Sequence, residues 1–280
     1  MQKTWLITGA SRGLGTEIAK AALRAGDRVV ATGRKRETMI DALGPDSDQL
    51  LSVALDVTDA AQAKAAINAA VSRFGTVDLL VNNAGYGQLG FFEENTSEAI
   101  QAQFATNLFG VFNVTSAVLP VMRSARQGRI FNLSSLAGIQ GAGFASLYCA
   151  SKFALEGFSE SLAQELAPFG IFVTIVEPGP FRTDFLASES VRFGEHIVAD
   201  YDNRRAQLRA SFEQRNGQQP GDPAKLAEAM VRLAGEDKPP MRFIAGSIAV
   251  NAADAKFAGM QAELERWRAL SVSTDGDYAA

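Results

Sequence analysis

Cysteine and histidine are nearly absent from this sequence of 280 residues. The single cysteine, Cys149, has no partner for an internal disulfide, and its isolation argues against cysteine-rich zinc modules. The single histidine, His196, leaves a typical zinc site short of nitrogen and sulfur ligands. The sequence therefore predicts a protein that uses neither disulfides nor a bound metal.

The sequence also lacks an excess of basic charge and a long apolar run. It has 27 lysines and arginines against 31 aspartates and glutamates, a net charge of −4, which does not favour binding to nucleic-acid phosphates. We see no apolar run of the length that spans a bilayer, and no signal-peptide segment before the first strand-like stretch. We therefore expect no nucleic-acid partner, no membrane span and a cytoplasmic location.

Short apolar runs alternate with longer helix-like segments along most of the chain. The runs are nearly continuous, as in strands of a parallel sheet that is covered on both faces. Right-handed crossovers then give a doubly wound α/β sheet with three layers, α/β/α, in a single domain over residues 1–280. The predicted strands are 5–7, 28–32, 50–55, 77–81, 129–133 and 171–176, and the main helices are 59–74, 96–124 (interrupted near its end by Pro120), 147–167 and 251–269.

Two segments differ from this alternation. Residues 185–222 are charged and rich in glutamine, and the region 181–220 has two interpretations: a solvated surface helix, or a lid over a cleft. Residues 271–280 are expected to form a flexible tail. No linker divides the chain, so both segments are assigned to the single domain.

A glycine-rich loop connects the first predicted strand to the first helix. The segment Thr8–Gly15 reads Thr-Gly-Ala-Ser-Arg-Gly-Leu-Gly. Glycines here permit a tight turn and close approach of the backbone, so that a diphosphate can bind at the helix N-terminus. A purely structural turn is one alternative. Another is a hydrolase nucleophile elbow, Gly-x-Ser-x-Gly, but only His196 would be its base and only one strand precedes the turn.

The end of the second strand indicates which dinucleotide would bind. An acidic residue roughly 20 positions beyond the glycine loop normally binds the ribose 2′-OH of NAD, whereas this sequence has Gly33 there. Arg34, Lys35 and Arg36 follow, and Arg12 lies in the glycine loop. Guanidinium groups suit a 2′-phosphate, so the sequence favours NADP(H) over NAD(H). A solvated basic helix start is the alternative.

A tyrosine and a lysine lie at positions i and i+4 of a predicted helix. Tyr148 and Lys152 therefore share one helix face, and Ser135 stands just beyond the fifth strand. Asn107 lies on the helical stretch after the fourth strand. A nearby positive charge favours tyrosinate, so we expect Lys152 to lower the pKa of Tyr148 from about 10 toward a useful range for acid–base catalysis. A surface pair is the alternative, and Ser134 is the alternative to Ser135.

In this order and at this spacing, the residues resemble the short-chain dehydrogenase/reductase family, closely over residues 3–180 and loosely beyond. The matching pieces are Thr8-Gly9-x-x-x-Gly13-x-Gly15, Asp56-Val57, Asn82-Asn83-Ala84-Gly85, Asn107, Ser135, Tyr148-x-x-x-Lys152 and Pro178-Gly179. The resemblance implies a Rossmann fold and four catalytic residues. They are Tyr148 as general acid, Ser135 on the same carbonyl oxygen, Lys152 on the nicotinamide ribose, and Asn107 supporting a water of a proton relay.

The same resemblance implies a set of cofactor-binding residues at the carboxyl ends of the strands. They are Thr8, Gly9, Ser11, Arg12, Gly13, Leu14, Gly15, Arg34, Asp56, Val57, Asn83, Ala84, Gly85, Tyr148, Lys152, Pro178, Gly179 and Thr183. Substrate contacts are expected from aromatic residues in or near loops, namely Phe144, Phe181 and Phe185. Core packing is the alternative for each of these three.

The C-terminal part departs from the common pattern of the family. Residues 239–243 and the helix near 251–269 take the place of a Val-Asp-Gly-Gly-like end of the last strand. They resemble the hydroxysteroid- or retinol-dehydrogenase-like branch. Relatives commonly pair through helices that match 96–124 and 147–167, so the resemblance implies a homodimer or homotetramer.

Together these features predict an NADP(H)-dependent oxidoreductase that interconverts a small-molecule ketone or aldehyde, of apolar character, and its alcohol. A dinucleotide-binding sensor without turnover is one alternative, but the complete Asn107, Ser135, Tyr148 and Lys152 set speaks against it. A nucleotide-sugar epimerase or dehydratase is another. Such relatives usually have a different glycine spacing and a larger C-terminal domain.

Overall fold

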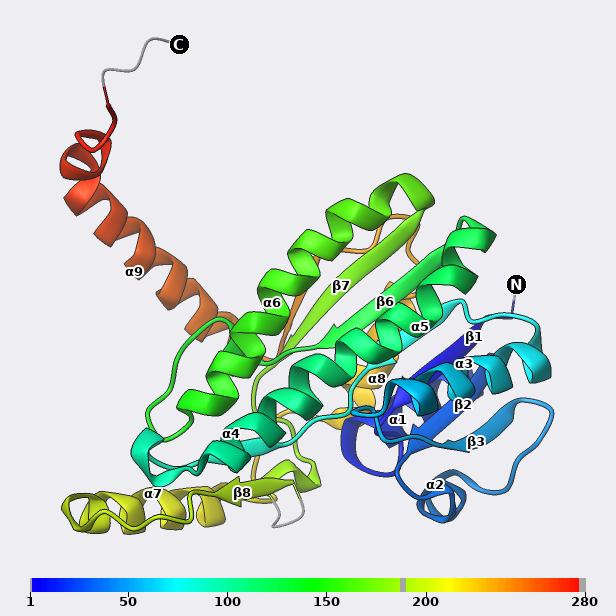
Figure 1. Cartoon of the computed structure of the whole chain (residues 1–280), viewed down its shortest axis with the longest axis horizontal. Helices are drawn as coiled ribbons and strands as arrows, with labels where there is room; N and C mark the ends of the chain where they lie inside the picture. Colours follow the sequence, from blue (N-terminus) through cyan, green and yellow to red (C-terminus); the bar gives the residue numbers. More distant parts are fainter. Residues whose placement is uncertain (1, 187–189, 277–280) are drawn as a thin grey trace.

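A seven-stranded parallel sheet forms the centre of the molecule (Figure 1). The computed structural model describes residues 2–186 and 190–276. The strand order is β3-β2-β1-β4-β6-β7-β9, and every neighbouring pair is parallel. The bounds are β1 Thr4–Thr8, β2 Arg28–Gly33, β3 Leu50–Ala54, β4 Leu79–Asn82, β6 Gly128–Leu133, β7 Ile171–Pro178 and β9 Arg242–Ala245. The predicted doubly wound α/β sheet in a single domain is confirmed.

Helices cover both faces of this sheet and create two hydrophobic cores. Successive side chains of a strand point to opposite faces, so Trp5 and Ile7 of β1 enter one core and Leu6 enters the other. The first core includes side chains of α1, α2 and α8, and the second includes side chains of α3, α5 and α6. The helices are α1 Gly13–Arg24, α2 Arg36–Leu43, α3 Ala60–Phe74, α4 Ser97–Phe104, α5 Gly110–Ala125, α6 Ser146–Leu166, α7 Asp202–Arg215, α8 Pro223–Leu233 and α9 Ser247–Val272.

Local capping explains where several helices begin and end. α3 begins after Asp59, whose carboxylate accepts two backbone hydrogen bonds from the first turn. It ends at Gly75, which adopts a left-handed φ of +84°. α8 begins in the same way, with Asp222 as its cap and Pro223 at the first helical position.

The helical stretch predicted over 96–124 is interrupted at a different place from the one expected. α4 and α5 are separated by a π-helical turn, Ala105–Phe109, whereas α5 continues through Pro120 to Ala125. A proline removes only one backbone donor, and Val118 and Met122 pack in the second core on either side of it. Packing therefore holds α5 together across the proline.

The continuous stretch Ser97–Ala125 is long and apolar enough to cross a membrane, judged by length and composition alone. Within the fold, Val114 and Val118 of this stretch pack against the sheet in the second core. Core helices pass the same test of length and hydropathy, so this stretch is weak support for a membrane span.

The C-terminal part completes the sheet and then leaves it. β9 pairs with β7, and α9 follows directly as a longer helix than the predicted 251–269. Because α9 continues to Val272, the predicted tail over 271–280 overlaps the end of this helix. Residues 277–280 of that tail lie outside the described residues.

The segment 181–220 contributes a second, two-stranded sheet. Its strand β8 (Val191–Phe193) pairs in parallel with β5 (Gly87–Leu89), and α7 follows. Sequence periodicity did not predict this pair, because three-residue strands are too short to show a pattern and the partners are about a hundred residues apart. Residues 187–189 of this segment lie outside the described residues.

Candidate active site

A large cavity of about 750 Å³ opens at the carboxyl ends of the parallel strands. The strand order reverses between β1 and β4, and open α/β sheets bind ligands at such a switch point. All but four of the predicted site residues line this cavity. Those that line it are Gly9, Ser11, Arg12, Gly13, Leu14, Arg34, Asp56, Val57, Asn83, Ala84, Gly85, Ser135, Tyr148, Lys152, Pro178, Gly179, Phe181, Thr183 and Phe185.

The glycine loop forms the wall of the cavity between β1 and α1. Gly9 and Gly13 have φ values of +65° and +57°, which L side chains rarely adopt. A Cβ atom at Gly15 would lie 2.3 Å from the carbonyl oxygen of Gly9, so only glycine lets α1 pack this closely on the loop. The loop thus permits a diphosphate to approach the N-terminus of α1.

Thr8 and Asn83 hold the glycine loop in place. The side-chain amide of Asn83 donates to the carbonyl oxygens of Thr8 and Gly9, at 2.9 and 3.0 Å. The Thr8 hydroxyl accepts hydrogen bonds from the backbone N–H groups of Asn83 and Ala84, at 2.9 and 3.0 Å. Thr8 and Gly15 lie behind the wall, so they shape the loop and, contrary to the prediction of direct binding, do not line the cavity.

Basic side chains line the cavity beside the end of β2. Arg34 follows Gly33 and is exposed, and Arg12 of the glycine loop lines the same cavity. Arg36 is held elsewhere, because its guanidinium group donates to the carboxylate of Asp46 at 2.6 Å. Arg12 and Arg34 are therefore the arginines that lie where a 2′-phosphate is predicted.

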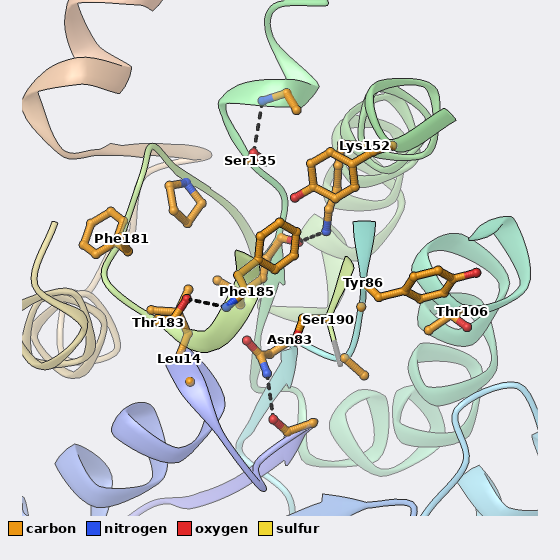
Figure 2. A pocket seen from close by; sticks show the side chains of 18 of the residues that line it. Leu14, Asn83, Tyr86, Thr106, Ser135, Lys152, Phe181, Thr183, Phe185 and Ser190 are labelled. Atoms are coloured by element: carbon orange, nitrogen blue, oxygen red, sulfur yellow. Dashed lines mark hydrogen bonds between the residues drawn. The ribbon is translucent and has the colours of Figure 1, made fainter. Parts of the chain in front are cut away.

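Tyr148 and Lys152 of α6 line the middle of the cavity, together with Ser135. Figure 2 shows Ser135 and Lys152 on this wall. The Lys152 ammonium nitrogen lies 5.8 Å from the centroid of the Tyr148 ring. It donates a hydrogen bond of 2.6 Å to the carbonyl oxygen of Leu133, the last residue of β6. The i, i+4 spacing thus brings the phenol and the ammonium group to one wall of the cavity.

The expectation that Lys152 lowers the pKa of Tyr148 is contradicted. Burial raises the pKa of Tyr148 to about 12, and a hydrogen bond with Ser135 offsets only part of this rise. Burial also lowers the pKa of Lys152 to about 8, against the opposing effect of the Glu156 charge. The reason is that both groups are desolvated, while the ammonium group is directed to the Leu133 carbonyl. Tyr148 therefore keeps its proton at neutral pH.

Hydrogen bonds distinguish Ser135 from its neighbour. Ser134 is buried, and its hydroxyl donates to Glu156 of α6. Ser135 forms the hydrogen bond with Tyr148 and also accepts one from the backbone N–H of Ala137, at 3.1 Å. Ser135 is therefore the serine that lies beside the phenol.

A partly buried cluster of charges lies next to this wall. Arg242 of β9 donates hydrogen bonds to three carboxylates, those of Glu156, Glu160 and Glu177. Glu177 of β7 is fully buried, and burial followed by the charge of Glu156 raises the pKa of Glu177 to about 7. The charge of Glu156 also raises the pKa of Lys152, so Arg242 of the last strand and Lys152 of the cavity wall interact with the same carboxylate.

Asn107 lies behind the cavity wall, within the π-helical turn. Its side chain is buried, accepts a hydrogen bond of 3.1 Å from the Tyr86 N–H and donates one of 2.9 Å to the Tyr86 carbonyl oxygen. It also donates to the Ser151 hydroxyl at 3.3 Å. Asn107 does not line the cavity, but it holds the loop after β4, whose residues Gly85 and Tyr86 do.

Two of the three phenylalanines predicted to contact substrate line the cavity. They are Phe181 and Phe185 (Figure 2), and the Phe185 ring centroid lies 5.6 Å from that of Tyr148. Phe144 does not line the cavity, because its ring is buried in a separate core, 5.2 Å from the ring of Phe91. For Phe144 the alternative of core packing is therefore correct.

Several cavity residues were missed by the sequence analysis. Arg192 of β8 lies with its guanidinium carbon 4.7 Å from the ring centroid of Tyr86, and both line the cavity. Phe212 and Arg215 of α7 line it too, as does the buried Gln219. α7 thus contributes part of the cavity wall, which favours the lid interpretation over a solvated surface helix. The charged composition of the segment was the only signal, since its fold depends on the distant strand β5.

The cavity suits a nicotinamide dinucleotide. The glycine loop can receive a diphosphate, Arg34 follows the end of β2, and Arg12 and the Tyr148–Lys152 pair line the same cavity. Among residues 2–186 and 190–276, no group of three or more His, Cys, Asp and Glu side chains could hold a metal ion.

Known proteins are similar in sequence to this chain over most of its length. The family model described as short chain dehydrogenase matches residues 3–192. Oxidoreductase BOA17 of Botryotinia fuckeliana is 39% identical over 275 residues, which cover 98% of this chain and 100% of that protein. Retinol dehydrogenase 8 of Bos taurus is 42% identical over 255 residues, which cover 86% of this chain and 80% of that protein.

Solved structures share the fold as well. A short-chain dehydrogenase from Streptomyces avermitilis matches with a TM-score of 0.89 and 38% identity, covering 99% of this chain and 100% of that one. ElxO, solved with NADP bound, matches with a TM-score of 0.70 and 28% identity, covering 85% of this chain and 94% of that one. With a site built of these residues, the chain is a member of the short-chain dehydrogenase family, an oxidoreductase that acts on CH–OH groups.

Proposed function

We propose that this oxidoreductase uses NADP(H) to interconvert an apolar ketone or aldehyde and its alcohol. The observation that carries the proposal is the placement of Tyr148 beside Ser135 and Lys152, in one cavity with the glycine loop. The cofactor, when bound, supplies or accepts the hydride. A carbonyl group that receives hydride needs a proton at its oxygen, and the phenol can provide it.

Each residue of the set has a role in this reaction. In reduction, the Tyr148 hydroxyl donates its proton to the carbonyl oxygen, while the Ser135 hydroxyl donates a hydrogen bond to the same oxygen. Lys152 is charged below its pKa of about 8 and binds the nicotinamide ribose. Asn107 holds the loop after β4 through the backbone of Tyr86. The family resemblance adds a water on Asn107 that links Lys152 to solvent as a proton relay.

Charge at the end of β2 favours NADP(H) over NAD(H). Gly33 leaves this point without a carboxylate, and Arg12 and Arg34 line the cavity beside it. Guanidinium groups bind phosphates through charge-assisted and often bidentate hydrogen bonds. ElxO, a relative solved with NADP bound, adds support.

An apolar substrate is favoured by the aromatic side chains near the phenol. Phe181, Phe185 and Phe212 all line the cavity, and Phe185 packs against the Tyr148 ring. The similarity to retinol dehydrogenase 8 adds support for an apolar alcohol. The substrate thus belongs to the aromatic, steroid-like or long aliphatic carbonyls and their alcohols.

The proposal is tested by following NADPH and NADH oxidation with a panel of aromatic, steroid-like and aliphatic carbonyls. We expect turnover with the more apolar members, and faster turnover with NADPH. Binding of NADPH without turnover of any carbonyl would instead support a dinucleotide-binding sensor. Cofactor that stays bound through purification, again without net oxidation, would support an epimerase or dehydratase.

Replacing Arg34 by alanine is expected to weaken NADPH binding about 10- to 100-fold, because a hydrogen bond to a charged group contributes about 1.5–3 kcal/mol. NADH binding should stay unchanged, since NADH has no 2′-phosphate. Titration of cofactor fluorescence gives both dissociation constants. The control is Lys35→Ala, because Lys35 is the exposed neighbour and does not line the cavity. An equal loss for both cofactors would contradict the assignment.

The two directions of the reaction should respond differently to pH. Tyr148 has a pKa of about 12 and Lys152 one of about 8, so both keep their protons and the initial rate of reduction should be nearly constant from about pH 6 to 7. Oxidation needs tyrosinate, whose fraction rises about tenfold per pH unit below the pKa. We therefore expect the initial rate of oxidation to rise continuously up to about pH 8, above which Lys152 loses its charge. A plateau near neutral pH would show a lower tyrosine pKa.

A further inference from the structure

The helix α9 extends away from the body of the molecule (Figure 1). At its base, Ala249 and Ala253 are buried, whereas every residue from Phe257 to Val272 is exposed. The exposed part is about 24 Å long at 1.5 Å per residue. Isolated helices of this length are marginal in water, because helices gain most of their stability by packing an apolar face. We therefore expect the exposed part of α9 to pack against a partner that is outside the described part of the chain.

One face of α9 carries an apolar stripe with heptad spacing. Steps of three and four residues alternate along Val250, Ala253, Phe257, Met260, Leu264 and Trp267. The four large side chains from Phe257 to Trp267 are each about half exposed, between 48% and 56%. Among the described residues, eight of the thirteen exposed large hydrophobic side chains lie on α9, and such a concentration marks an interaction surface.

We propose that this stripe binds the α9 helix of a second copy of the chain, in antiparallel orientation. A stripe of alternating steps of three and four is matched by another helix with the same spacing. In the antiparallel pair, Phe257 faces the partner's Trp267, and Met260 faces the partner's Leu264. A two-fold axis near residue 262 then repeats both contacts, so that all four side chains of each copy are buried in the pair.

The charges of α9 favour a second copy over a lipid surface. In this pair, Asp254 lies opposite the partner's Arg268, which gives two attractive contacts, against one repulsive contact between Glu263 and the partner's Glu263 near the axis. Helices that bind membrane surfaces are rich in lysine and arginine. α9 instead has a balanced set of charges, from Asp254, Lys256, Glu263, Glu265, Arg266 and Arg268. If α4, α5 and α6 also pair as the family resemblance implies, the α9 contact joins two dimers into a tetramer.

The proposal is tested by measuring the molecular mass in solution against concentration, by sedimentation or light scattering. Leu264→Glu places a charge in the stripe and should halve the mass at concentrations where the wild type is associated. Ala262→Glu adds the same charge to another face of the same helix and should associate like the wild type. Both positions are exposed and far from the cavity lining, so catalytic activity should stay unchanged in both variants and exclude misfolding of the body as the cause.

Two further measurements address the pairing itself. Asp254→Arg should weaken association, and the double variant Asp254→Arg/Arg268→Asp should restore it. Trp267 is about half exposed while Trp5 is fully buried, so a blue shift of emission with rising concentration reports burial of Trp267. The proposal would be overturned if the wild-type protein had the mass of one chain at every concentration. It would also be overturned if Leu264→Glu had the same mass as the wild type. A blue shift only with phosphatidylcholine vesicles would assign the stripe to a membrane.

Discussion

Replacing Tyr148 by phenylalanine is expected to reduce kcat for carbonyl reduction about a thousandfold while NADPH still binds. A positioned proton donor contributes about 10²- to 10⁴-fold to a rate. Phenylalanine keeps the ring that packs 5.6 Å from Phe185 and removes only the hydroxyl that carries the proton. Steady-state kinetics measure the loss, and titration of cofactor fluorescence shows that the site is intact.

Tyr86→Phe is the matched control for this variant. Tyr86 also lines the cavity, and its buried hydroxyl has no hydrogen-bond partner among the described residues. Removing that hydroxyl should change kcat little. The assignment of Tyr148 as proton donor would be wrong if Tyr148→Phe kept a kcat within about tenfold of the wild type. It would also be wrong if Tyr86→Phe were the variant that lost activity.

Replacing Arg242 by leucine is expected to lower the free energy of unfolding by about 3 kcal/mol at pH 8. Removing one partner of a buried ion pair costs about 3–5 kcal/mol, and the lower end applies because the Arg242 side chain is one-third exposed. The change leaves Glu156 and Glu177 buried without their cation. Denaturant unfolding of the purified protein measures the difference.

The size of this loss should depend on pH in a defined direction. The pKa of Glu177 in the folded protein is about 7, above the 4.5 of an exposed glutamate, so the folded state binds more protons between these values. The stability from this group is complete below about pH 4.5 and is lost as the pH rises through about 7. Without Arg242 the pKa of Glu177 rises further. The loss in Arg242→Leu should therefore be smaller at about pH 5.5 than at pH 8.

Two further variants test whether the lost stability comes from the uncompensated buried carboxylates or from the removal of an arginine side chain as such. Arg232 is highly exposed, and its nearest carboxylate oxygen, on Glu236, lies 4.0 Å away, so Arg232→Leu should cost less than about 0.5 kcal/mol. Glu177→Gln in the Arg242→Leu background removes one uncompensated charge and should recover part of the loss. An equal loss at both pH values, without recovery in the double variant, would contradict the role of the buried carboxylates.

The parallel sheet was predictable because its signals are local. The runs around Trp5 and Ile130 are continuous and apolar, and in the structure they lie between two layers of helices. The glycine loop was predictable for the same reason. A side chain at Gly15 is excluded by the carbonyl oxygen of Gly9, which is only a few residues away in the sequence. The C-terminal helix was predicted too, but its projection away from the body was not, because the pattern of a helix does not say what it packs against.

The sequence by itself determined the sheet, the nucleotide-binding loop and the pairing of Tyr148 with Lys152, because each depends on neighbours along one strand, turn or helix. Only the tertiary structure decided the raised pKa of Tyr148, the burial of Phe144 and the contribution of α7 to the cavity wall. The physical reason is that desolvation and packing are set by residues far apart in the chain. The charge that Lys152 brings to Tyr148 is local, but the burial that outweighs it is made by the whole fold.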